Sequence, residues 1–178
     1  MDMTNPINNI LMSTMYKLHP SIEGTSHLHH LQRYSFKNIN SCDKIKFMST
    51  SEQHLTKHES FDCLNRWASA VSRQDISTVL GCYHSSASLW PTLSNTLRTN
   101  PEQLEDYFKG FLPKISGSVE WNECVFQSIS QHTALWSGSY TFSTNNGPAH
   151  ARFTYLLTKE GDLWKIQHHH SSLMPNPK

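Results

Sequence analysis

The run His168-His169-His170-Ser171-Ser172, close to the end of the chain, brings together side chains that could support acid–base chemistry. An imidazole exchanges a proton near neutral pH, and an adjacent hydroxyl can hold or orient a water molecule. The preceding Trp164-Lys165-Ile166-Gln167 alternates apolar and polar residues, which is typical of a half-buried β-strand. Successive strand side chains point to opposite faces, so His169 is predicted to lie at the surface or at a subunit interface. The residues predicted to share the inward face are Trp164, Ile166, His168, His170 and Ser172.

Three helices are predicted ahead of this strand. Thr56 and Glu59 form a capping box at the start of the first, and apolar residues follow at helical spacing. Asp75 can cap a second, short helix. Asn100-Pro101 combines a capping side chain with a proline in the first turn, which predicts a third helix that ends before Pro113.

The pattern then changes to a period of two. A short strand is predicted over residues 87–93, and longer strands over 119–128, 133–143, 149–158 and 163–172. Turn-forming residues separate the later strands, which indicates antiparallel neighbours. Helices followed by a run of such strands predict an α+β fold. We expect a strongly curved, mostly antiparallel sheet wrapped over three helices, a cone with a pocket inside.

Residues 1–53 differ in character from the rest of the chain. They are rich in Asn, Ser, His and Met and show no sustained periodicity. We interpret them as a poorly ordered extension, and residues 54–178 as the folded domain. The scarcity of acidic residues leaves an organellar leader open, and Met48 leaves open a start site assigned too early.

Composition restricts the partners. The 15 Lys and Arg nearly balance the 14 Asp and Glu, which argues against a nucleic-acid-binding or anionic membrane surface. No apolar run approaches the ~20 residues of a membrane span, so a cytoplasmic location is expected unless the extension is a leader. The cysteines lack paired zinc-finger spacing and are expected to be reduced; they are Cys42, Cys63, Cys82 and Cys124.

Several local motifs together resemble a known family. The chain over about residues 56–176 resembles the nuclear transport factor 2-like fold, and within it the branch of the calcium/calmodulin-dependent kinase II association domain. The His-His-His-Ser-Ser ending is similar to the signature of iota-class carbonic anhydrases. The motifs are Leu89-Trp90-Pro91-Thr92-Leu93-Ser94, Arg98, Asp106-Tyr107-Phe108, Ser137-Gly138-Ser139-Tyr140-Thr141-Phe142, Ala151-Arg152-Phe153-Thr154-Tyr155, and His169-His170-Ser171-Ser172 followed by Met174-Pro175.

This resemblance implies reversible hydration of carbon dioxide to bicarbonate in the conical pocket. Such a reaction needs a held water, a route for its proton and donors for the developing negative oxygen. The residues that correspond to a bicarbonate-binding pocket in the carbonic anhydrases are Thr92, Tyr107, His170 and Ser172. Apolar walls are expected from Trp90, Phe108 and Phe153.

Further substrate contacts are predicted around these residues. Arg98 and Arg152 lie in motif-matching segments and could attract bicarbonate or an inhibitory anion, although by strand alternation the direction of Arg152 is open. His168 and Ser171 complete the predicted substrate-binding set. Ser171 stands where association-domain relatives have an arginine, which weakens any expectation that this chain binds the ligands of the kinase module.

A resident metal is not predicted. Alternation prevents all three consecutive histidines from reaching one ion, and a catalytic zinc usually has three protein ligands. We expect a metal-free site, while the resemblance leaves zinc and manganese open. A homodimer through the sheet face is expected. The alternatives are a non-catalytic assembly module and another pocket enzyme of the same fold, such as an isomerase or dehydratase; the latter usually has an inward Asp–His pair, which is not evident.

Overall fold

Helix α1 (Thr50–Ser72) opens the described part of the chain, which is residues 48–175 of a computed structural model. Ser49 caps this helix. Its side chain accepts a hydrogen bond from the Glu52 backbone N–H, and the Glu52 carboxylate accepts one from the Ser49 backbone N–H at 2.8 Å. The predicted start at Thr56 is therefore wrong, because that residue is buried inside the helix. Two successive capping boxes exist in the sequence, and the helix uses the earlier one.

The second and third helices follow the predicted caps. Helix α2 (Ile76–Gly81) begins after Asp75, whose side chain accepts a hydrogen bond from the Thr78 backbone N–H at 3.0 Å. Helix α3 (Pro101–Phe111) begins after Asn100, which caps Gln103 at 2.9 Å, and a short 3-10 turn (Leu112–Lys114) follows it. Both predicted starts are confirmed.

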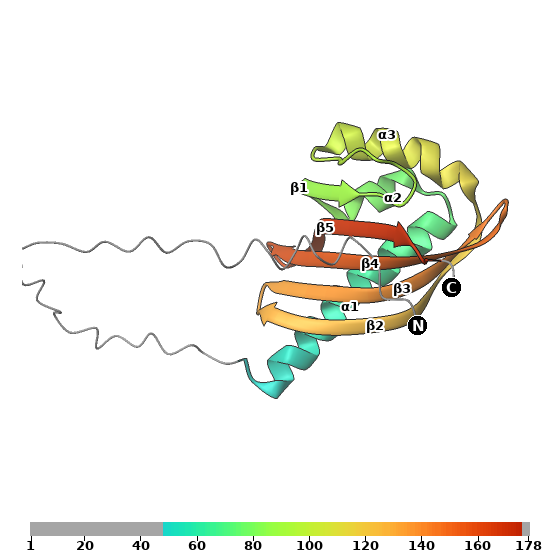
Figure 1. The fold of residues 1–178 in the computed structure, drawn as a ribbon. Coiled ribbons are helices and arrows are strands. Elements are labelled where there is room, and N and C mark those ends of the chain that lie inside the picture. The colour runs from blue at the N-terminus through green and yellow to red at the C-terminus, as the bar shows by residue number, and fades with distance from the viewer. Residues whose placement is uncertain (1–47, 176–178) are drawn as a thin grey trace, which may run out of the picture. The chain divides into compact units, whose positions relative to one another are not determined.

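The sheet contains five strands in the order β1-β5-β4-β3-β2. Strands β2 to β5 form antiparallel neighbours, and β1 pairs with β5 in parallel. The predicted α+β architecture, with three helices on a curved and mostly antiparallel sheet, is confirmed (Figure 1). The first strand lies earlier than predicted. The strands are β1 (Tyr83–Trp90), β2 (Ile115–Ser130), β3 (Thr133–Thr144), β4 (Gly147–Glu160) and β5 (Leu163–Leu173).

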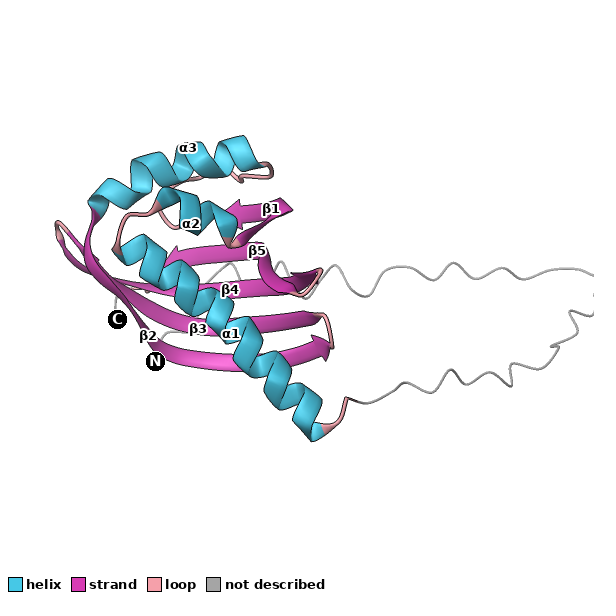
Figure 2. Cartoon of the chain, turned by 180° about the vertical axis from the view of Figure 1, so that it is seen from behind, coloured by secondary structure: helices cyan, strands magenta, loops and turns pink. Residues whose placement is uncertain are grey.

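The core lies between α1 and the sheet face that α1 crosses (Figure 2). Its centre is aromatic: Trp67 from α1 meets the edge of Tyr155 at 5.7 Å between ring centroids, and Trp121 stacks on Tyr140 at 5.8 Å. The opposite face carries no helix among the described residues (Figure 1). We call the covered face the inner face and the other the outer face.

A β-bulge at Gln167 decides which residues of β5 reach the core. Ile166 pairs with Leu157 and His168 pairs with Leu156, so the Gln167 between them has no partner on β4. Gln167 and His168 both point outward as a result. From there on the alternation is shifted by one residue. The buried positions of β5 are Trp164, Ile166, His169 and Ser171.

Residues 50–53 form the first turn of α1, so the predicted boundary between extension and domain at residue 54 is too late. Residues 1–47 lie outside the described part of the chain, so the extension stays a prediction there. In the range that is described, none of the helices combines the length and apolar character that a membrane span requires.

Candidate functional site

His169 is the centre of a buried polar network on the inner face. Its side chain is 3% exposed and stacks on the ring of Tyr155 at 4.0 Å between centroids. Its Nδ1 lies 2.9 Å from the Tyr83 hydroxyl, and its Nε2 lies 3.3 Å from the Tyr140 hydroxyl. Both ring nitrogens therefore have a tyrosine partner inside an aromatic core.

Ser171 extends this network toward the loop after β1. The Tyr140 hydroxyl donates a hydrogen bond to Ser171 Oγ at 2.6 Å, and Ser171 Oγ also contacts Thr92 Oγ1. Strand alternation places Ser171 beside His169, because they are two residues apart on β5. The loop that carries Thr92 is closed by two backbone hydrogen bonds between Leu89 and Arg98, at 2.8 and 2.9 Å.

The hydrogen-bond donors of the network follow from its geometry. Tyr140 gives its only hydroxyl proton to Ser171, so it can only accept from His169, and Nε2 must carry a proton. Burial lowers the pKa of His169 well below its ordinary value, and the neighbouring histidines add to this effect. The ring is thus neutral, Nδ1 is an acceptor, and the Tyr83 hydroxyl donates to it.

A small cavity lies against these groups. The space that it leaves for the centre of a water molecule is about 10 Å³, which is room for about one water. Trp67 is one of its walls, and the buried indole N–H makes no hydrogen bond of good geometry, with the Tyr83 hydroxyl as its neighbour. Burial raises the pKa of the Tyr107 and Tyr140 hydroxyls, so both stay protonated at neutral pH. The cavity is lined by Trp67, Leu89, Pro91, Thr92, Tyr107, Phe108, Phe111, Tyr140, Phe142, His169 and Ser171.

The predicted inward histidine and serine are wrong by one residue. His170 and Ser172 lie on the outer face and do not line the cavity, and His169 and Ser171 take the positions predicted for them. The prediction that His169 lies at the surface is wrong for the same reason. The cause is the bulge at Gln167, which strict alternation cannot anticipate.

Three of the predicted substrate contacts also lie outside the cavity. His168 is on the outer face, where its Nδ1 lies 2.8 Å from Ser88 Oγ. Trp90 is 45% exposed and pairs with His170 on that face, so it is not an apolar wall. Arg152 is exposed and points the same way, opposite Ser172 and Ser139. Phe153 is buried in the core but does not line the cavity.

The other predicted positions lie at the cavity. Thr92, Tyr107, Phe108 and Ser171 line it. Arg98 lies just outside, with its guanidinium carbon 5.8 Å from the centre of the Tyr107 ring. The inferences about where these side chains lie are thus supported, whereas their roles with a substrate stay predictions.

Sequence reasoning missed the aromatic partners of the network. Tyr83, Tyr140 and Trp67 were not among the predicted site residues, although Tyr140 is in a motif that carries the resemblance. Tyrosine is a common core residue, and its hydroxyl becomes informative only when its partner is known. A correct register for β5 would have directed attention to Tyr140, which lies across β4 from the terminal motif.

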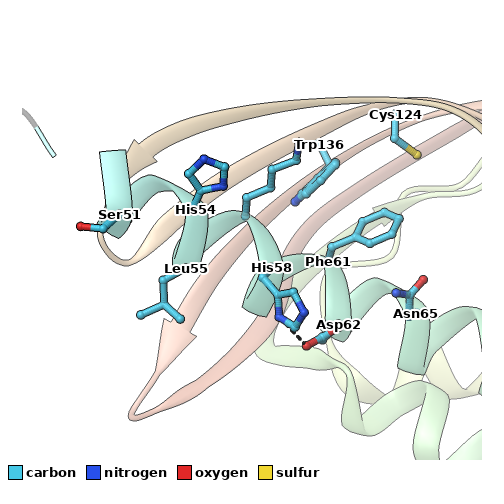
Figure 3. Close-up of a pocket in the computed structure, with 10 residues that line it drawn as sticks. Ser51, His54, Leu55, His58, Phe61, Asp62, Asn65, Cys124 and Trp136 are labelled. Carbon is cyan, nitrogen blue, oxygen red and sulfur yellow. Dashed lines mark ion pairs between the residues drawn. The ribbon is translucent and has the colours of Figure 1, made fainter. Parts of the chain in front are cut away.

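A larger groove runs along the first half of α1 (Figure 3). Phe61, Trp136 and Cys124 lie on its sheet side, and His58 pairs with Asp62 at 3.1 Å on the exposed helix. Its polar side chains do not point toward a common centre, and in this respect it differs from the His169 cavity. Within residues 48–175 no three His, Cys, Asp or Glu side chains gather as a metal site. The expectation of a metal-free site remains a prediction.

Comparison with known proteins places this geometry in a family. The family model of the calcium/calmodulin dependent protein kinase II association domain matches residues 56–175, about two thirds of the chain. The chain belongs to the association domain family. The matched range includes every residue that lines the cavity, from Trp67 to Ser171.

Solved structures agree with this assignment. A protein from Xanthomonas campestris described as an association domain of this kinase is 32% identical, with a TM-score of 0.60 over 64% of this chain and 84% of that one. A ketosteroid isomerase-like protein from Erwinia carotovora atroseptica is 14% identical, with a TM-score of 0.59 over 66% and 95%. An NTF2-like protein of unknown function from Pseudomonas putida is also 14% identical, with a TM-score of 0.59 over 74% and 99%. The last two show the NTF2-like fold alone. The chain matches none of the curated proteins.

Proposed function

We propose that the His169 cavity reversibly hydrates carbon dioxide to bicarbonate. The observation that carries this proposal is the set of three linked hydroxyls, from Ser171, Thr92 and Tyr140, at an otherwise aromatic cavity with room for about one water. A small, linear and nonpolar substrate is suited to such walls. Because one water fills this space, the cavity must widen to admit carbon dioxide beside it, and a large substrate is excluded.

The reaction can be assigned to named groups. A water held by Thr92 and Ser171 attacks the carbon of carbon dioxide, one C=O electron pair moves to its oxygen, and the water loses a proton, giving bicarbonate and H⁺. Trp67 lines the same cavity, and its indole N–H is assigned as a donor to the oxygen that becomes negative. Because its pKa is raised, the Tyr107 hydroxyl is a second neutral donor rather than a base.

His169 acts in this scheme as a positioning residue. Its neutral ring fixes Tyr140 as a donor toward Ser171, which leaves the Ser171 proton free to point at Thr92 or at the water. Exchange of the two ring tautomers would reverse every donor in the chain of hydrogen bonds. The far end, Tyr83, is buried, so the released proton passes from the attacking water to solvent water beyond Tyr107 and not through His169.

The test is a carbon dioxide hydration assay on metal-stripped protein, by stopped flow with a pH indicator. Ser171→Ala is expected to lower kcat/KM at least tenfold, and Ser172→Ala, one residue away on the outer face, to leave it within about twofold. His169→Gln and His170→Gln form a second matched pair with the same expectation. Wild-type protein with no activity, with or without added zinc or manganese, would overturn the proposal. Equal losses at 171 and 172 would overturn the site.

A second function, assembly without catalysis, is favoured by the family and by the outer face. That face carries exposed apolar side chains on two separate strands, Trp90 on β1 and Val125 on β2, and no described helix covers it. Self-association through this face is compatible with the enzyme as well, so the hydration assay decides between the two. An inactive protein that assembles would be an association module.

A further inference from the structure

A second, polar pocket lies immediately outside the His169 cavity. The two share Tyr107 and Phe111 as walls, so these side chains separate one space from the other. The outer pocket leaves about 250 Å³ for the centre of a water molecule, far more than the inner cavity. We call it the vestibule; it is lined by Leu93, Ser94, Arg98, Asp106, Tyr107, Gly110, Phe111 and Lys114.

The vestibule holds two cations and one carboxylate. Arg98 and Lys114 form no ion pair within 4 Å among the described residues, and neither does Asp106. By contrast, Lys109 on the same helix as Asp106 pairs with Glu105 at 2.7 Å. Positive charge in the vestibule is therefore in excess and not neutralised by a neighbour.

Arg98 is held in place by its own loop. One guanidinium nitrogen donates to the Thr96 carbonyl at 2.6 Å and the other terminal nitrogen to Ser94 Oγ at 3.2 Å. Two of its five N–H donors are thereby used, and the others remain for a ligand. The same loop carries Thr92 into the inner cavity, so one segment presents a hydroxyl to the inside and a fixed cation to the outside.

From these observations we propose that the vestibule binds small oxyanions and carboxylates, bicarbonate among them, between Arg98 and Lys114. Tyr107 is the partition that such an anion passes on its way to or from the inner cavity. The assignment of bicarbonate rests on the proposed function, whereas binding of a small carboxylate does not. Asp106 limits the occupant to one negative charge, because a second would lie against this carboxylate.

Formate is the probe, added as its sodium salt at constant ionic strength and followed through the backbone amide resonances of Arg98, Tyr107 and Lys114. A saturable shift is expected in the wild type. Lys114→Gln is expected to weaken it about fivefold, as is typical of one lost charge near the surface, and the Arg98→Gln, Lys114→Gln double variant to abolish it. Arg98→Lys keeps the charge and guards against a folding defect, and it should bind better than Arg98→Gln. Lys109→Gln, the matched control, should bind as the wild type does.

Two outcomes would overturn the vestibule: a shift that grows linearly without saturating, and saturation that survives in the double variant. The hydration assay tests the proposed function independently of the vestibule. If formate binds but the protein does not hydrate carbon dioxide, the vestibule proposal stands and the proposed function is wrong. If the protein hydrates carbon dioxide and formate inhibits the wild type and the double variant equally, the proposed function stands and the vestibule proposal is wrong.

Discussion

At the scale of single residues, Tyr140 and Tyr155 are neighbours in the core with different surroundings for their hydroxyls. Tyr140 donates to Ser171 and contacts His169, whereas the buried Tyr155 hydroxyl lies beside that of Tyr140 without a hydrogen bond of good geometry. We expect Tyr140→Phe to lower the free energy of unfolding by about 1–2 kcal/mol, because it strips partners from two buried groups. Tyr155→Phe should change it by less than about 0.5 kcal/mol or raise it. Urea unfolding of both variants measures this, and equal losses would contradict the network.

The charge state of His169 gives a second prediction at this scale. Its folded pKa lies well below the unfolded value of about 6.5, so below that pH the unfolded chain binds a proton that the folded chain does not. Stability contributed by the neutral ring is therefore complete above about pH 6.5 and falls by up to about 1.4 kcal/mol per unit as pH decreases. Urea unfolding between pH 7.5 and 5.5 should show a steeper loss in wild type than in His169→Gln, whose amide does not titrate.

The tautomer of His169 is open to direct measurement. Nitrogen-15 spectra of the ring are expected to show a neutral imidazole with its proton on Nε2 from pH 8 down to pH 5.5. A proton on Nδ1 would reverse the order of donors that the Tyr140–Ser171 bond implies.

At the scale of elements, the pairing of β2, β3 and β4 depends on Gly138. A Cβ built on this residue would lie 1.8 Å from the Glu123 carbonyl oxygen and 3.0 Å from the Phe153 ring. The neighbouring strand β2 bulges here, because Asn122 is skipped in the backbone pairing with β3. Gly138→Ala should therefore cost at least about 2 kcal/mol of stability. Gly110→Ala, where nothing lies within 4 Å, should add about 0.5–1 kcal/mol, since alanine is the better helix former. Thermal unfolding compares the two, and a mild effect at 138 would contradict the close approach.

Prediction from sequence failed for the inner positions of β5, because of the bulge at Gln167. The Asn100 and Asp75 caps identified two helices, because a capping side chain and its target N–H are local in sequence. The four long strands were located by alternation and turn residues. The inner positions of β5 were not, because Gln167 is skipped through pairing with β4 and contacts β1 through Ser86, neither of which is local. Three identical residues in a row made the correct register impossible to read from the motif itself.

At the scale of the whole molecule, the outer face is the surface where self-association is expected. One row across the five strands joins Trp90, His170, Thr154, Ser137 and Val125. Val125→Glu buries a charge in any interface formed there and should shift the protein toward the monomer in analytical ultracentrifugation. Leu163→Glu, similarly exposed but at the first residue of β5, seven positions from His170 of this row, is the control and should not. Unchanged assembly in the Val125 variant would place the interface elsewhere.

The bulge at Gln167 has one more consequence, for the redundancy of the terminal motif. His169 and Ser171 are two residues apart, and so are His170 and Ser172. If one residue before the motif were removed and the bulge kept, His170 and Ser172 would lie opposite Tyr155 and Phe153, where His169 and Ser171 now lie, and would supply the same functional groups. The repeated residues thus amount to a second copy of the pair, held on the outer face, and a one-residue deletion before the motif need not abolish what it does.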